Sequence, residues 1–343
     1  MSFIPDVLSF IDGRKAESAQ DWALRRDEIL ELLAREEYGF LPEKKPVRIS
    51  TLGKNNAHSG GRGIEEKLEL RIEADMGPFT VPVTLLYPDT PEKHPLFLYI
   101  SFSPDIYQHY FPAETVLSRG YAVAMLHYTA ITSDDGDMQN GLAGLMDRAD
   151  DGSGWGKISL WAWTLSRALD ALLLRDDIDK ANIAVIGHSR LGKTALWCGA
   201  NDERIRFVCV NDSGCSGAAM ERCKNPDSET AEKIYRRFPF WFCENYQKHG
   251  FDVDNMPFDQ HFALAACCPR FVAVHSASLD DWADPASEMR SCLNASPVWK
   301  LYGMKGLDEG VKGSLSYFLR EGTHYLALAD WTAYMDFIEA HKA

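Results

Sequence analysis

The stretch IAVIGHSRLGKTALW, residues 183–197, fits two different kinds of site. Its letters GHSRLGKT match the phosphate-binding pattern G-x-x-x-x-G-K-[ST], in which Lys193 would hold a nucleotide phosphate. The same letters place Ser189 between an apolar run and a helical segment, which is the position of a nucleophile on a sharp strand-to-helix turn. The rest of the chain has to decide between these two interpretations.

Apolar runs typical of fully buried strands recur on both sides of this stretch, and segments with helical periodicity separate them. Two earlier segments, residues 66–74 and 79–88, alternate apolar and polar residues as half-buried antiparallel strands do. This layout predicts an α/β fold in which a mostly parallel central sheet has helices on both faces and antiparallel strands at its N-terminal end. The apolar runs are residues 96–102, 121–128, 182–188, 206–212 and 270–277.

Composition limits the partners that the protein can have. The 343 residues carry a formal net charge of -14, which repels nucleic acid and anionic membrane surfaces. No run of eighteen apolar residues and no secretion signal stands out, so we expect a cytoplasmic protein that acts on a small molecule or an oligosaccharide. We expect one domain, residues 1–343, with a helical N-terminal extension over about 1–45, and the oligomeric state stays open.

The cysteines and histidines give no sign of a metal or a cofactor. All eight cysteines lie between Cys198 and Cys292, and none of them has a zinc-like spacing to another cysteine or to a histidine. We therefore expect mostly buried, reduced thiols, no metal and no cofactor.

A serine nucleophile needs partners further along the chain, and the sequence provides them in the required order. A serine hydroxyl is a weak nucleophile, so a histidine must take its proton and a carboxylate must stabilise the resulting imidazolium. His324 lies in a turn after the last predicted strand, and three aspartates follow residues 270–277. These aspartates are Asp280, Asp281 and Asp284.

The phosphate-loop interpretation stays open as a distant alternative. Asp212 ends an apolar run and could hold magnesium beside a phosphate bound to Lys193. Against this, several predicted strands precede Gly187, and the loop has few glycines for a backbone that must wrap around phosphates.

The string GHSRLGK resembles the G-C-S-R-x-G-K signature of the glucuronoyl esterase family, which are α/β-hydrolases that cleave esters of glucuronic acid. His188 stands where the family has cysteine. Further matching pieces follow in the family's order along nearly the whole chain. They are EEYGFLP (36–42), NDSGCSGAA (211–219), MPFDQH (256–261), DDWADP (280–285) and REGTH (320–324).

The resemblance implies a role for each matching position. Ser189 corresponds to the nucleophile and His324 to the general base. Arg190 corresponds to the arginine that helps to hold the oxyanion. Lys193 corresponds to a lysine that binds hydroxyls of the glucuronate ring, and Trp282 to a tryptophan that lines the sugar site.

The acid of the triad and the substrate remain open at this stage. The resemblance offers Asp280 and, as the alternative, Asp212, with Asp281 or Asp284 as remaining candidates. The main expectation is a glucuronoyl or 4-O-methyl-glucuronoyl esterase. An acetylxylan or other sugar-acetyl esterase with the same triad is the alternative.

Overall fold

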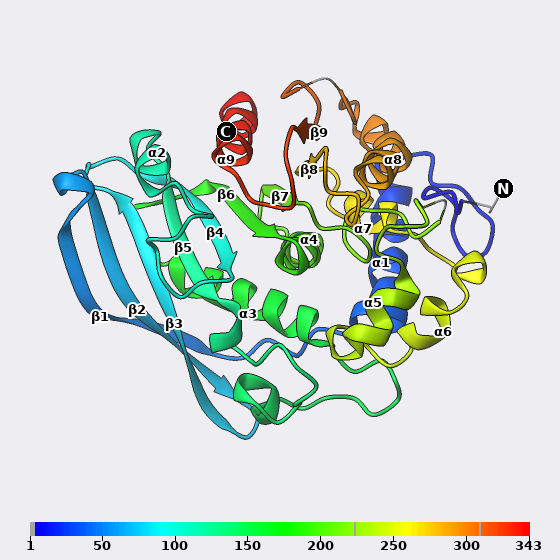
Figure 1. Cartoon of the computed structure of the whole chain (residues 1–343), viewed down its shortest axis with the longest axis horizontal. Helices are drawn as coiled ribbons and strands as arrows, with labels where there is room; N and C mark the ends of the chain where they lie inside the picture. The colour runs from blue at the N-terminus through cyan, green and yellow to red at the C-terminus, as the bar shows by residue number, and fades with distance from the viewer. Residues whose placement is uncertain (1–3, 223, 309) are drawn as a thin grey trace.

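The computed structural model describes residues 4–222, 224–308 and 310–343. Within these ranges the strands form one nine-stranded sheet in the order β1-β2-β3-β5-β4-β6-β7-β8-β9 (Figure 1). The strands are β1 (Val47–His58), β2 (Gly63–Ala74), β3 (Gly77–Pro88), β4 (His94–Ser101), β5 (Ala122–His127), β6 (Ile178–His188), β7 (Phe207–Asn211), β8 (Phe271–Ala277) and β9 (Leu315–Arg320).

The sheet has an antiparallel part and a parallel part. β1, β2 and β3 pair antiparallel at one end, and β3 also pairs antiparallel with β5. From β5 to β9 every neighbouring pair is parallel. The carboxyl ends of β6, β7, β8 and β9 therefore meet at one edge of the sheet, where ligands bind in folds of this kind.

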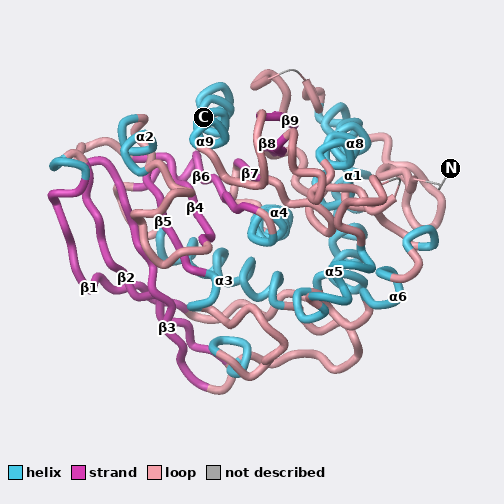
Figure 2. The backbone as a smooth tube through the Cα atoms, viewed as in Figure 1, coloured by secondary structure: helices cyan, strands magenta, loops and turns pink. Residues whose placement is uncertain are grey.

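Helices cover both faces of the sheet (Figures 1 and 2). α3 and α4 pack on one face with α1 and α7 behind them, and α2 and α9 pack on the other. The helices are α1 (Ala19–Leu33), α2 (Ala113–Ser118), α3 (Lys157–Leu172), α4 (Arg190–Asn201), α5 (Ala231–Arg237), α6 (Tyr246–Gly250), α7 (His261–Ala265), α8 (Pro285–Ala295) and α9 (Leu328–His341).

This arrangement confirms the predicted fold class. The five apolar runs became β4 to β8, and the two alternating segments became β2 and β3. Sequence analysis missed β1, because most of its side chains are exposed and it has no alternating apolar pattern. Among the described residues, no helix is both long enough and apolar enough to cross a membrane.

Candidate active site

Ser189 occupies a strained turn between β6 and α4. Its backbone has φ 59° and ψ -129°, a conformation that residues other than glycine rarely adopt. The strand and the helix can approach this closely only because Gly187 has no side chain: a Cβ there would lie 2.0 Å from the carbonyl oxygen of Leu191. The turn presents Ser189, half-buried, at the carboxyl end of the sheet, and the N-terminus of α4 points its free N–H groups in the same direction.

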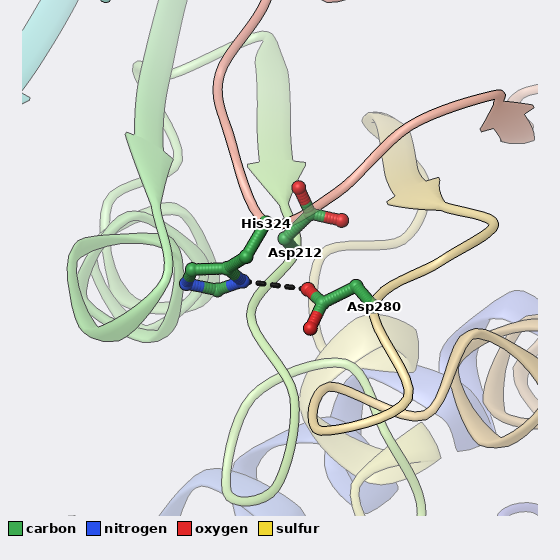
Figure 3. A group of neighbouring side chains, drawn as sticks. All are labelled: Asp212, Asp280 and His324. Atoms are coloured by element: carbon green, nitrogen blue, oxygen red, sulfur yellow. Dashed lines mark hydrogen bonds and ion pairs between the residues drawn. The ribbon is translucent and has the colours of Figure 1, made fainter.

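His324 lies on the loop between β9 and α9 and is hydrogen-bonded to Asp280. The His324 Nδ1 atom is 2.6 Å from the Asp280 Oδ2 atom, and the carboxylate points directly at the ring (Figure 3). Asp280 is buried, whereas 41% of the His324 side chain is exposed. Because Asp280 occupies Nδ1, the Nε2 atom of His324 is the one available to exchange a proton with a substrate or a nucleophile.

Asp212 lies close to this pair but is held differently. Potential ligand atoms of Asp212, Asp280 and His324 all lie within 4.8 Å of one another, yet the Asp212 carboxylate points away from the imidazole (Figure 3). Its Oδ2 atom is 3.2 Å from a guanidinium nitrogen of Arg320. Burial, together with the charges of Glu288 and Asp280, raises the pKa of Asp212 to about 8. No other group of three potential metal-ligating residues was found in the described ranges.

His188, the residue that departs from the family signature, packs against His324. The two ring centroids are 4.5 Å apart, and the Nδ1 atom of His188 is 2.6 Å from the Oδ1 atom of Asn211. Burial, and secondarily the charge of His324, lowers the pKa of His188 to about 3. His188 is therefore a neutral ring at neutral pH and does not compete with His324 for a proton.

Ser189 and His324 line the same pocket, which has an open volume of about 630 Å³. No hydrogen bond joins these two side chains among the described residues, and such bonds are often long until substrate binds. Arg190 also lines the pocket, and Asp134 binds its guanidinium in an ion pair. The Asp134 carboxylate accepts a second hydrogen bond, 2.7 Å long, from the indole N–H of Trp241.

Lys193 and Trp282 form the other side of the pocket. Lys193 is buried on the first turn of α4, donates a hydrogen bond to the carbonyl oxygen of Ser213 and lies 3.2 Å from the Glu229 Oε2 atom. Trp282 follows Asp280 by two residues and remains 46% exposed. A pocket with an ammonium, a carboxylate and an aromatic face has the groups that bind sugar hydroxyls and pack on a sugar ring.

The structure thus brings together seven of the nine residues that the sequence singled out. Asp284 instead caps α8 by accepting a hydrogen bond from the backbone N–H of Ser287, and Asp281 is exposed. Sequence reasoning missed Asp134, Glu229 and Arg320. Each of them acts on a predicted residue across a large separation along the chain, which a local pattern does not reveal.

Comparison with known proteins agrees with this geometry. The family model described as "Glucuronyl esterase, fungi" matches residues 75–303. The carbohydrate esterase MZ0003 of an unknown prokaryotic organism is 32% identical, and the alignment covers 98% of this chain and 89% of that protein. The chain belongs to the glucuronoyl esterase family. It is accordingly a carboxylic ester hydrolase, and the predicted family is confirmed.

Solved structures give the same result. The glucuronoyl esterase from Solibacter usitatus superposes with a TM-score of 0.89 at 31% identity, covering 99% of this chain and 98% of that one. A structure described as a promiscuous CE15 esterase from the marine bacterial metagenome has a TM-score of 0.90 at 30% identity, covering 99% and 97%. The phosphate-loop alternative gains no support, because Lys193 is already bound by Ser213 and Glu229 inside an esterase fold.

Proposed function

We propose that this glucuronoyl esterase hydrolyses esters of glucuronic or 4-O-methyl-glucuronic acid through Ser189, His324 and Asp280. The observation that carries the proposal is the Asp280–His324 hydrogen bond at the mouth of a pocket that also contains Ser189. A relative from Phanerochaete carnosa, 26% identical over 88% of this chain and 72% of its own length, is named 4-O-methyl-glucuronoyl methylesterase. That name supports the substrate class.

The reaction starts when the Ser189 Oγ atom attacks the ester carbonyl carbon and its proton passes to the Nε2 atom of His324. Asp280 stabilises the imidazolium that forms. The developing oxyanion lies at the N-terminus of α4, beside the guanidinium of Arg190. The C–O bond to the alcohol then breaks, His324 returns the proton to the leaving oxygen, and the uronoyl group remains on Ser189 until water, activated by His324, releases it.

The sugar ring would lie between Lys193 and Trp282. An ammonium has three N–H donors, and Lys193 uses one on Ser213 and directs another toward Glu229, so a third is available for a ring hydroxyl. Glu229 can accept a hydrogen bond from a neighbouring hydroxyl. These polar groups would serve an acyl group that carries hydroxyls, and an acetyl group has none.

The decisive experiment compares a methyl glucuronate ester with an aryl acetate. We expect the glucuronate ester to have the higher kcat/KM. We also expect Lys193→Ala to reduce this preference by about ten- to a hundred-fold, the value of a lost charge-assisted hydrogen bond. The ratio of the two kcat/KM values is the quantity to compare. Lys193→Ala also leaves Glu229 unpaired, and a resulting displacement of α4 would slow the hydrolysis of both esters alike. If the acetate is the better substrate and the ratio does not change in the variant, the protein is a general sugar-acetyl esterase.

A further inference from the structure

Two cations of α5 form a rim on the substrate pocket. Lys233 and Arg237 line the same cavity as Ser189 and His324, and both side chains are exposed. They are four residues apart, so they lie on the same side of the helix about one turn from each other. Neither residue takes part in the proposed chemistry at the ester carbonyl.

The cations inside the pocket are paired, whereas those of the rim are not. Asp134 pairs with Arg190, and Glu229 pairs with Lys193. In contrast, no carboxylate of the described residues lies within ion-pair distance of Lys233 or Arg237. The guanidinium of Arg237 lies 5.0 Å from the centre of the Phe238 ring, and its N–H groups donate no hydrogen bond to any other described residue.

Lys233 is held in place by backbone carbonyls and not by a carboxylate of the described residues. Its ammonium donates hydrogen bonds to the carbonyl oxygens of Ser228, at 2.6 Å, and Pro226, at 3.2 Å. Two carbonyl dipoles orient the group, and one of its three N–H donors remains free. The ammonium also lies 5.3 Å from the centre of the Trp282 ring, which places it on the proposed sugar side of the pocket.

This local positive charge contrasts with the molecule as a whole. A net charge of -14 repels anions at long range, yet this pocket is lined by two cations that no described carboxylate pairs with. The same helix also carries a cation that is paired with a carboxylate. Arg236 lies next to Arg237 but forms an ion pair with Glu232 at 2.8 Å.

We propose that Lys233 and Arg237 bind a carboxylate of the substrate that is not the ester under attack. The esterified carboxyl group is neutral and lies at Ser189, so the anion has to come from another sugar. The rim therefore fits an oligosaccharide in which a second, unesterified uronate lies next to the esterified one. This inference rests on the proposed glucuronoyl esterase activity and adds the charge of the neighbouring sugar to the definition of the substrate.

The test uses two disaccharide methyl esters that differ at one group. In one, the esterified uronate is joined to a second uronate with a free carboxylate; in the other, that carboxyl group has been reduced to the alcohol. We expect the acidic disaccharide to have a kcat/KM roughly five-fold higher at low ionic strength, mainly through KM, as two exposed ion pairs allow. Added salt should reduce the preference, because it screens exposed charges.

Variants of α5 decide whether the rim is responsible. Arg237→Gln should lower the preference by half or more, and Arg237→Glu should abolish or reverse it. Arg236→Gln is the matched control and should leave the preference as in the wild type. A third disaccharide with a sulfate ester in place of the carboxylate tests the other common source of anionic charge on a glycan, and we expect it to bind less well than the carboxylate.

The outcomes separate this inference from the proposed function. If neither disaccharide ester is hydrolysed, the glucuronoyl esterase proposal fails. If both are hydrolysed at equal rates, or if Arg237→Glu keeps the preference for the acidic one, the enzyme acts as proposed but the rim has no such role. A preference for the sulfated disaccharide would overturn the assignment of a carboxylate.

Discussion

Asp212 and Asp280 lie at the ends of neighbouring parallel strands, and both are buried close to His324. Their surroundings nevertheless differ. Asp280 follows β8 on a loop and points one oxygen at the Nδ1 atom of His324. Asp212 directly follows β7 and has φ 41°; its carboxylate points away from the imidazole (Figure 3) and accepts a hydrogen bond from Arg320. Two residues of the same type at the same edge of the sheet are therefore held by different partners.

Arg320, the last residue of β9, accounts for much of this difference. It is almost completely buried and donates hydrogen bonds to the backbone carbonyls of Thr323 and Tyr325, which flank His324. The same guanidinium contacts Asp212 at 3.2 Å and Asp330 at 2.7 Å. One side chain thus holds the His324 loop and binds Asp212, while Asp280 remains directed at the imidazole. The comparison shows that proximity to the histidine does not by itself decide which carboxylate is hydrogen-bonded to it.

The largest effect should come from Ser189, since the comparison of the two acids has meaning only if His324 activates this residue. Ser189→Ala should lower kcat for ester hydrolysis by several orders of magnitude, because a triad acts as a unit and the loss of its nucleophile stops acyl transfer. Thermal unfolding should stay near the wild-type value, since the Ser189 hydroxyl forms no hydrogen bond with another described residue and its loss removes only one atom. Activity close to that of the wild type in the purified variant would remove Ser189 from the mechanism.

The next largest effect should distinguish the two acids directly. Asp280→Asn should lower kcat on the order of 10²- to 10⁴-fold, because an amide favours the wrong imidazole tautomer and cannot stabilise imidazolium. Asp212→Asn should cost less than about ten-fold, because its carboxylate is not bonded to His324. Steady-state kinetics of both variants on one glucuronate ester give the ranking. The reverse order would make Asp212 the acid.

Much of this geometry could be predicted from the sequence, and the reasons are physical. The strand-to-helix turn at Ser189 is local. A strand, a turn and a helix follow one another within a few residues, so a short stretch of sequence is enough to predict it. The sequence favoured Asp280 over Asp212 without deciding between them, because the direction of the Asp212 carboxylate depends on Arg320, which lies 108 positions away. The pairing of Lys193 with Glu229 was hidden for the same reason.

A smaller effect should follow from removing the contacts of Arg320, which binds Asp212 and holds the loop that carries His324. Arg320→Gln should lower kcat by about ten- to a hundred-fold with little change in KM, because a His324 displaced by about 1 Å is a poor base for a substrate that still binds. Arg320→Lys keeps the positive charge and should recover part of the loss. The variant also leaves the buried Asp330 carboxylate without its Arg320 partner, which costs about 3–5 kcal/mol of stability. Rates should therefore be taken per folded molecule, and an unchanged kcat on that basis would make Arg320 a purely structural residue.

The last expected effect concerns stability rather than rate, and it tests the protonation of Asp212. Burial raises the pKa of this carboxyl to about 8 in the folded protein, whereas an aspartate in an unfolded chain titrates near ~3.9. Between these two values the unfolded chain has lost a proton that the folded protein keeps. The unfolded state then binds fewer protons, so the free energy of unfolding falls as the pH rises, by at most about 1.4 kcal/mol per pH unit.

Asp212→Asn removes this titration, so the variant should gain stability relative to the wild type as the pH rises from 4 toward 8, and the gain should level off above 8. Urea unfolding of both proteins across this range measures the difference, and the other titrating groups largely cancel in it. Asp281→Asn, an exposed aspartate beside the same site, is the control and should show no such trend.

The opposite result is equally informative. If Arg320 keeps Asp212 ionised throughout, the variant leaves a buried guanidinium without one of its partners and should be less stable than the wild type at every pH in the series. The two carboxylates would then both be charged in the folded enzyme, and the distinction between them would rest on the direction of their hydrogen bonds alone.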